Sequence, residues 1–260
     1  MAVEGARGLR RSGAFLPQPL YVSRLAEDRV VAGVPVRVFT PPDVGGTYLH
    51  LHGGGFVYGS ARLQDNRLER LALSCRVEVF SVEYRLAPED PYPAAPDDCE
   101  AVALALAERG AGPLSIGGES AGANLAVTTL VRSRDRHGFT GFRAAVLSCG
   151  VYDLTLQRFA DTQDPSLTRA ELTRLIAEYA GESALTSPDL SPAHADVSDL
   201  PAALFAVGSL DPLVQDSVLM AELWRNAGNF ARLVVVPDAL HGVDAADDVH
   251  RFLRRRLGTG

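Results

Sequence analysis

The sequence has no lysine, few cysteines and no long apolar run, and these absences narrow the classes of protein that it can encode. All 25 residues counted as lysine or arginine are arginine, which reflects a compositional bias and carries no functional conclusion. The 32 acidic residues outnumber them, so the formal net charge is −7. Because a nucleic-acid-binding protein needs a basic surplus to neutralise phosphates, this balance argues against nucleic acid as the main partner.

The three cysteines are Cys75, Cys99 and Cys149. Their spacing matches neither a Cys-x-x-Cys pair nor a zinc-binding pattern, and their odd number argues against a framework of disulfides. Each lies in an apolar or helical stretch. We therefore expect three small buried side chains and no metal site.

No apolar run approaches the roughly 20 residues that are needed to span a bilayer. The N-terminal segment carries Arg7, Arg10 and Arg11, but Pro17 and Pro19 interrupt the apolar stretch after it, which does not resemble the core of a signal peptide. We expect a cytoplasmic protein with no membrane partner. Its 260 residues suit one large domain or two small ones, and its 47% hydrophobic content allows a sizeable core.

Apolar strands alternate with helical stretches along most of the chain. Strands are expected at 22–28 and 34–40, as an antiparallel hairpin at a sheet edge, and at 48–51, 77–82, 114–117, 144–148, 203–207 and 232–236. Helices are expected at 63–74, 97–108, 122–136, 169–179, 216–226 and 244–257. This alternation predicts a single α/β domain over residues 1–260, with a mostly parallel eight-stranded sheet flanked by helices.

The alternation breaks over residues 153–200, where one helical stretch lies between irregular segments rich in Ser, Pro and Asp. Segments inserted into α/β folds usually cover the crevice at the carboxyl ends of the strands. We therefore expect this block to form part of a cap. The alternative is a surface embellishment with no contact to the site.

A Gly-Glu-Ser-Ala-Gly sequence at 118–122 places Ser120 between an expected strand and an expected helix. The pattern Gly-x-Ser-x-Gly is typical of the nucleophile elbow, a sharp turn that leaves the serine Oγ exposed at the top of the sheet. Gly118 and Gly122 lack Cβ, so the strand and the helix can approach closely. Taken alone, the pattern also fits a glycine-rich turn that happens to hold a serine, so other motifs must decide.

A second glycine cluster, His-Gly-Gly-Gly-Phe at 52–56, directly follows the strand expected at 48–51. Gly53, Gly54 and Gly55 make sense where backbone N–H groups must point at a ligand without side chains in the way. An oxyanion hole needs such donors, and the N–H of Ala121, the residue after the serine, would complete it. A merely flexible loop does not explain why both motifs follow strands in this order.

A serine hydroxyl is a weak nucleophile and needs a base. We expect His241 to be the base, because it follows the strand at 232–236 through a short loop. His50 and His52 flank the glycine loop and are expected to be structural, and His137 is expected to cap a helix end at the surface. His194 lies in the inserted block and His250 within a helix.

The acid that orients the base should lie between the serine and the histidine in the chain. Asp211 fits, because it follows the strand at 203–207 in a loop. Asp216 is a competitor, but it lies near the start of the next helix, where an acid favours the helix dipole. Asp238 is too close to His241. We therefore expect Asp211 to orient His241, which takes the proton of Ser120.

Together these motifs resemble the bacterial hormone-sensitive-lipase-like (family IV) esterases of the α/β-hydrolase superfamily. The residues that carry the resemblance are 52–56, Tyr-Arg-Leu-Ala-Pro-Glu at 84–89, Pro-Tyr-Pro-Ala-Ala at 91–95, 118–122, Asp-Pro-Leu at 211–213 and His-Gly at 241–242. Members of that family often have Asp where Glu119 stands here and Phe where Val243 stands. Both departures look tolerable.

The resemblance implies a serine carboxylesterase that hydrolyses short- to medium-chain carboxylic esters through an acyl-enzyme intermediate, without a cofactor. Amide, lactone or thioester bonds are alternatives, because the same three residues serve them all. Some relatives are small-molecule receptors that have lost the catalytic histidine, which the presence of His241 argues against.

The resemblance also implies a cap built from about 1–20 and 153–200. Because the first of these segments is short, we expect a reduced cap and a relatively open site. The stretch 84–95 is expected to support the active site from below, with Arg85 and Glu89 in internal polar contacts. A homodimer through the edge strand at 232–236 is plausible by resemblance only.

Overall fold

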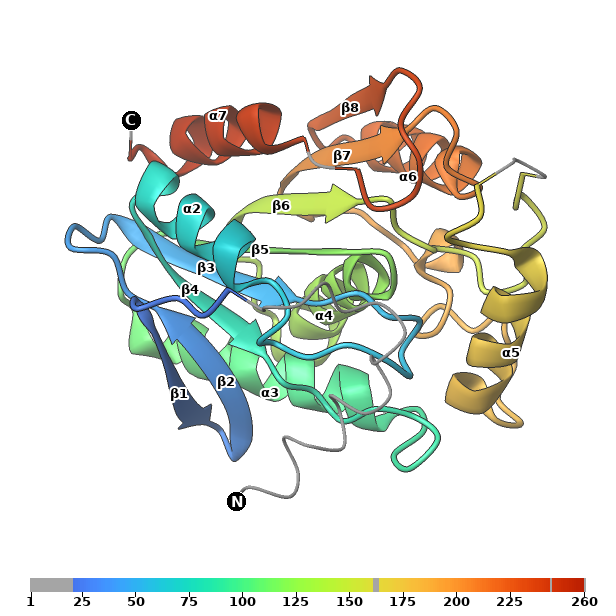
Figure 1. Cartoon of the computed structure of the whole chain (residues 1–260), viewed down its shortest axis with the longest axis horizontal. Helices are drawn as coiled ribbons and strands as arrows, with labels where there is room; N and C mark the ends of the chain where they lie inside the picture. The colour runs from blue at the N-terminus through green and yellow to red at the C-terminus, as the bar shows by residue number, and fades with distance from the viewer. Residues whose placement is uncertain (1–20, 161–163, 244, 260) are drawn as a thin grey trace.

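An eight-stranded sheet runs through the protein (Figure 1), whose computed structural model describes residues 21–160, 164–243 and 245–259. In chain order the strands are β1 (Ala26–Val31), β2 (Val34–Phe39), β3 (Gly46–Leu51), β4 (Val77–Val82), β5 (Leu114–Glu119), β6 (Phe142–Ser148), β7 (Ala202–Gly208) and β8 (Ala231–Val236). Their order in the sheet is β1-β2-β4-β3-β5-β6-β7-β8. The β1–β2 and β2–β4 pairs are antiparallel and the rest are parallel, which confirms the predicted α/β fold.

Helices cover both faces of this sheet. They are α2 (Asp65–Cys75), α3 (Ala94–Arg109), α4 (Ala121–His137), α5 (Arg169–Ala180), α6 (Val214–Asn226) and α7 (Ala246–Leu257). On one face α2 packs against α7, and on the other α3 packs against α4 while α6 lies along β7 and β8 (Figure 1). Each face has its own apolar core, one around Leu68 and Leu253 and the other around Leu125 and Trp224.

Strands β3 and β4 in the middle of the sheet are buried at every position because helices cover both of their faces. All six residues of β3 and all six of β4 are buried, whereas β1 and β8 at the two edges of the sheet are partly exposed. The strands β3, β5, β6, β7 and β8 run parallel, so the loops that follow them all lie at the carboxyl ends of these strands. This end of the sheet carries the candidate site.

Two elements begin three or more residues away from the expected position. β1 begins later than expected, at Ala26, and its mixture of exposed and half-buried residues continues to Val31. The side chain of Val22, where the strand was expected to begin, is 68% exposed. α3 begins at Ala94 because Pro96 lies in its first turn, where a missing N–H costs no hydrogen bond. The other expected elements are present, with small changes at their ends.

The segment between β6 and β7 contains α5 and the short 3-10 helix η1 (Pro192–His194), and its described part forms no strand. In Figure 1, α5 lies beyond the carboxyl ends of the parallel strands. The N-terminal share of the expected cap, residues 1–20, falls outside the described residues. None of the helices described is long and apolar enough to cross a membrane.

Candidate active site

Ser120 lies at the sharp turn between β5 and α4. Its backbone has φ 54° and ψ −119°, a strained combination for a residue with a side chain and one that concentrates at functional sites. The turn can be this tight because the neighbouring glycines have no Cβ, for which there is no space. A Cβ on Gly122 would lie 2.0 Å from the carbonyl oxygen of Leu51, and one on Gly118 would lie 2.4 Å from the same atom.

The ring of His241 bridges Ser120 and Asp211. Its Nε2 lies 3.1 Å from the Oγ of Ser120, and its Nδ1 lies 2.9 Å from Oδ2 of Asp211. Asp211 is fully buried, and its other oxygen accepts the N–H of Leu213 over 2.8 Å. Because a carboxylate only accepts hydrogen bonds, Nδ1 donates to it and Nε2 is left to accept the proton of Ser120. The three residues therefore form a chain of hydrogen bonds.

The other acids considered from the sequence serve different roles. Asp216 lies in the first turn of α6, but its carboxylate accepts the N–H groups of Tyr152 (2.8 Å) and Asp153 (3.1 Å). Burial raises the pKa of Asp216 to about 6. Asp238 is exposed, and its N–H donates to Ser209. Neither carboxylate takes the place of Asp211 beside His241.

The other five histidines also lie within the described ranges. They contact other groups: His50 lies 3.5 Å from Glu119, His52 stacks on Tyr84, His137 bonds to Glu100, His194 lies 3.7 Å from Asp153 and His250 lies within α7. The structural roles expected for His50 and His52 agree with these contacts, and His241 is the histidine that the fold brings to Ser120.

The glycine loop after β3 is a tight turn that only glycine can form at its centre. Gly54 and Gly55 have φ of 124° and 60°, and a Cβ on Gly54 would lie 2.2 Å from the carbonyl oxygen of Tyr58. The loop borders the elbow, since a Cβ on Gly53 would lie 3.4 Å from that of Ser120.

The backbone N–H of Gly53, which was expected to face a substrate, has a partner within the protein. It donates to Oε1 of Glu119 over 2.6 Å, so this donor is already engaged within the protein. Gly54, Gly55 and Ala121 remain as candidate donors. The N–H of Ala121 is available because the first amides of a helix have no partner within it.

Glu119, which the sequence analysis treats only as a departure from Asp, joins the elbow to the glycine loop. Besides Gly53, its carboxylate accepts hydrogen bonds from Gln64 and Arg67 and lies beside His50. Burial by itself would raise the pKa of Glu119, but its neighbours outweigh this effect and hold that pKa below its usual value. Burial also lowers the pKa of His50 to about 4, so its ring is neutral near pH 7.

The stretch 84–95 supports the glycine loop. The hydroxyl of Tyr84 donates to the carbonyl oxygen of His52 over 2.6 Å, and the N–H of Ala87 donates to that of Phe56 over 3.1 Å. Arg85 pairs with Asp98 on α3, although half of its side chain is exposed. Glu89 is exposed, and the polar contact expected for it stays a prediction.

Two contacts from the segment between β6 and β7 reach the site. Leu175 of α5 lies over the glycine loop, where its Cδ1 would be 2.5 Å from a Cβ on Gly55. Asp164 accepts the backbone N–H of His241 over 2.6 Å. Neither Leu175 nor Asp164 belongs to a motif that predicts a role at the site. The expected cover from this block is consistent with these contacts, although its pattern gives no sign of which side chains reach the loops.

In the described part of the chain, Cys149 lies with Asp211 and His241 in a group whose atoms could ligate a metal. Its Sγ and the ligand atoms of Asp211 and His241 lie within 4.8 Å of one another. Asp211 and His241 are bonded to each other, and burial raises the pKa of the Cys149 thiol to about 12, which disfavours the thiolate that a metal needs. All three cysteines are free and buried, as expected.

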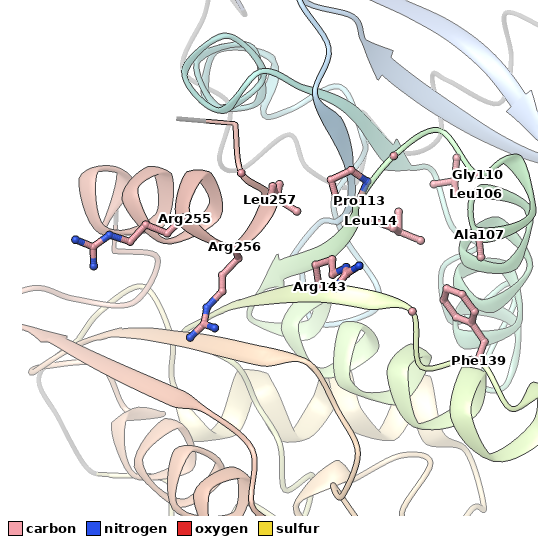
Figure 2. A pocket seen from close by; sticks show the side chains of 13 residues that line it. Leu106, Ala107, Gly110, Pro113, Leu114, Phe139, Arg143, Arg255, Arg256 and Leu257 are labelled. Atoms are coloured by element: carbon pink, nitrogen blue, oxygen red, sulfur yellow. The ribbon is translucent and has the colours of Figure 1, made fainter.

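A cavity of about 550 Å³ lies at the other end of the sheet, where the parallel strands β5 and β6 begin (Figure 2). Leu114 and Arg143, near the starts of β5 and β6, contribute to its wall together with Phe139 and Arg256. None of the predicted site residues lines this cavity. The hydrogen-bonded chain and the cavity are therefore two separate features.

Comparisons with known proteins agree with this geometry. A family model for the alpha/beta hydrolase fold matches residues 48–245. Two relatives from Mycobacterium tuberculosis are each 33% identical to this chain: esterase LipI, over 86% of this chain and 77% of its own, and carboxylesterase NlhH, over 92% and 82%.

Solved structures give the same picture. The hormone-sensitive-lipase homologue EstE7 from a metagenome library has a TM-score of 0.85 at 29% identity, covering 99% of this chain and 93% of that one. A hormone-sensitive lipase from a metagenome library has a TM-score of 0.85 at 28% identity, covering 98% and 99%. The chain therefore belongs to the hormone-sensitive-lipase-like esterase family of the α/β-hydrolase fold.

Proposed function

We propose that this protein is a serine carboxylesterase that hydrolyses short- to medium-chain carboxylic esters. The observation that carries the proposal is the hydrogen-bonded chain from Ser120 through His241 to the buried Asp211, with contacts of 3.1 and 2.9 Å. A nucleophile, a base and an orienting acid in hydrogen-bond reach are what acyl transfer requires. The esterase and carboxylesterase relatives support the same bond type.

In the proposed acylation step, the Oγ of Ser120 attacks the ester carbonyl carbon while Nε2 of His241 takes its proton. Asp211 holds the resulting imidazolium in place through Nδ1–H. The negative charge that develops on the carbonyl oxygen is stabilised by the N–H groups of Gly54, Gly55 and Ala121. Loss of one such donor typically costs about 2.7–4 kcal/mol of transition-state stabilisation.

The imidazolium of His241 then donates its proton to the departing alcohol, which leaves an acyl ester on Ser120. In the second half of the reaction, His241 takes a proton from water while the water oxygen attacks the acyl carbon. The bond to Ser120 then breaks, its Oγ receives the proton from His241, and the acid is released. Each proton that His241 accepts is returned within the cycle. The chemistry therefore balances with water as the only co-substrate.

The proposal is tested by replacing the nucleophile. We expect Ser120→Ala to lose nearly all turnover of p-nitrophenyl butyrate while its thermal unfolding stays close to that of the wild type. A fluorophosphonate should label the wild type and not the variant. Undiminished turnover in Ser120→Ala would refute the assignment. Amide, lactone and thioester substrates assayed in parallel test the alternative bond types.

A further inference from the structure

The loop that carries His241 has few contacts of its own. Its residue Leu240 is 41% exposed, and Gly242 on the other side of the histidine is also exposed. Hydrogen bonds hold the backbone on either side of the histidine: Ser209 accepts the N–H of Asp238 over 2.9 Å, Ala239 accepts that of Leu210 over 3.0 Å, and the sulfur of Cys149 accepts that of Gly242. Segments with so few buried contacts open readily, so the position of His241 depends on what else holds its backbone.

Asp164 supplies that contact from a distant part of the chain. Its Oδ2 accepts the backbone N–H of His241 over 2.6 Å, and the residue is only 4% exposed. Its Oδ1 accepts both the N–H (2.8 Å) and the hydroxyl (2.5 Å) of Ser166, so the carboxylate is oriented by a turn of its own segment. The contact therefore joins an oriented acceptor directly to the backbone of His241.

The charge of Asp164 adds to this geometry. Burial would raise the pKa of Asp164, but the donors of His241 and Ser166 outweigh burial and lower it, so the group is ionised. A hydrogen bond to an ionised acceptor is roughly twice as strong as one between neutral groups. The groups that face His241 are Asp211, Ser120, the thiol of Cys149 and Asp164.

We propose that Asp164 is a positioning residue for catalysis. It fixes the backbone of His241 so that the ring reaches Ser120 and Asp211 together, and it adds a second negative charge beside the imidazolium that forms during the reaction. The proposal rests on the proposed function, because it takes His241 as the base. The expected effect on the rate is large, because a misplacement of 1 Å can cost about 100-fold in rate.

A matched pair of variants separates this role from that of the turn. Asp196 forms the same kind of turn with Ser198, through contacts of 2.8 and 3.0 Å, but it is exposed and lies on a different loop. We expect Asp164→Ala to lower kcat on p-nitrophenyl butyrate by about 10-fold or more, with KM little changed. Asp196→Ala should match the wild type in both constants.

Two further readouts respond to the position of the histidine. Asp164→Asn, which keeps one acceptor oxygen, should recover part of the lost kcat. In proton NMR, the low-field signal of the Nδ1–H between His241 and Asp211 should weaken in Asp164→Ala, while circular dichroism stays that of the folded wild type. If Asp164→Ala does not fold, the same two measurements on Asp164→Asn decide.

The proposal is overturned if Asp164→Ala keeps a kcat within about twofold of the wild type, or if Asp196→Ala loses as much. An unchanged Nδ1–H signal beside a lowered kcat would also overturn it. Fluorophosphonate labelling distinguishes its failure from that of the proposed function. An unlabelled wild type refutes the esterase assignment, whereas equal labelling rates in the wild type and Asp164→Ala refute only the role of Asp164.

Discussion

Glu119, the last residue of β5, stabilises the glycine loop that follows β3. It precedes the nucleophile, yet its carboxylate accepts the N–H of Gly53 in the glycine loop. Arg67 and the N–H of Gly53 help to hold the pKa of this carboxylate below its usual value, although it is largely buried. One side chain thus sets the separation between Ser120 and the backbone donors that follow Gly53.

Neutralising Glu119 should therefore lower the rate more than it lowers substrate binding. In Glu119→Gln we expect kcat for p-nitrophenyl butyrate to fall by about 10-fold, because a neutral amide holds the Gly53 N–H less firmly and displaces the oxyanion donors. Glu119→Asp keeps the charge and should lose less. Steady-state kinetics at pH 7 with thermal unfolding curves would check this. A fully active Glu119→Gln would contradict the role given to the carboxylate.

Local sequence was sufficient to bring together Ser120, Asp211 and His241. Each follows its own strand within a few residues, and parallel strands end at one edge of the sheet. Glu119 and Asp164 were not predictable in this way. Their partners lie 66 and 77 residues away, and the contacts depend on how far a side chain reaches in the folded protein. The roles of all these residues remain predictions until the variants are assayed.

Helix α5 was predictable as a helix but not in its position. Thr168 caps its first turn by accepting the N–H of Glu171, and its apolar residues recur at helical spacing. Its packing is set by tertiary contacts. The ring of Tyr179 stacks on that of Phe56, with the ring centroids 3.9 Å apart, and Leu175 lies over Gly55. The helix therefore bounds the space above the proposed oxyanion donors.

Shortening the side chain of Leu175 should enlarge that space. We expect Leu175→Ala to raise the ratio of kcat/KM for p-nitrophenyl hexanoate over acetate, by roughly 10-fold if one to two methylenes gain contact. Leu68→Ala, in the core on the other face of the sheet, should reduce stability without changing this ratio. An acyl-length series on both variants gives the answer. An unchanged ratio in Leu175→Ala would mean that α5 does not limit the acyl group.

At the level of the whole molecule, Asp216 makes stability depend on pH. It joins α6 to the chain after β6 through the N–H groups of Tyr152 and Asp153. Because burial raises its folded-state pKa from 3.8 to about 6, protonation favours the folded state. This contribution is fully present below pH 3.8 and is lost as the pH rises through about 6.

Asp216→Asn removes this titration. We expect the free energy of unfolding of the wild type, minus that of Asp216→Asn, to fall by on the order of 3 kcal/mol as the pH rises over that window. Urea unfolding at a series of pH values measures both proteins, and the difference cancels the groups that they share. A difference that stays flat or rises with pH would show that Asp216 does not titrate in this way.

The position of β8 has a consequence for how this protein loses activity. Among the described strands β8 pairs with β7 alone and forms one edge of the sheet, yet the loop after it carries His241. An edge strand can detach at a lower free-energy cost than global unfolding. Catalysis would then stop while most of the backbone is still folded, which makes turnover a more sensitive reporter of partial denaturation than circular dichroism.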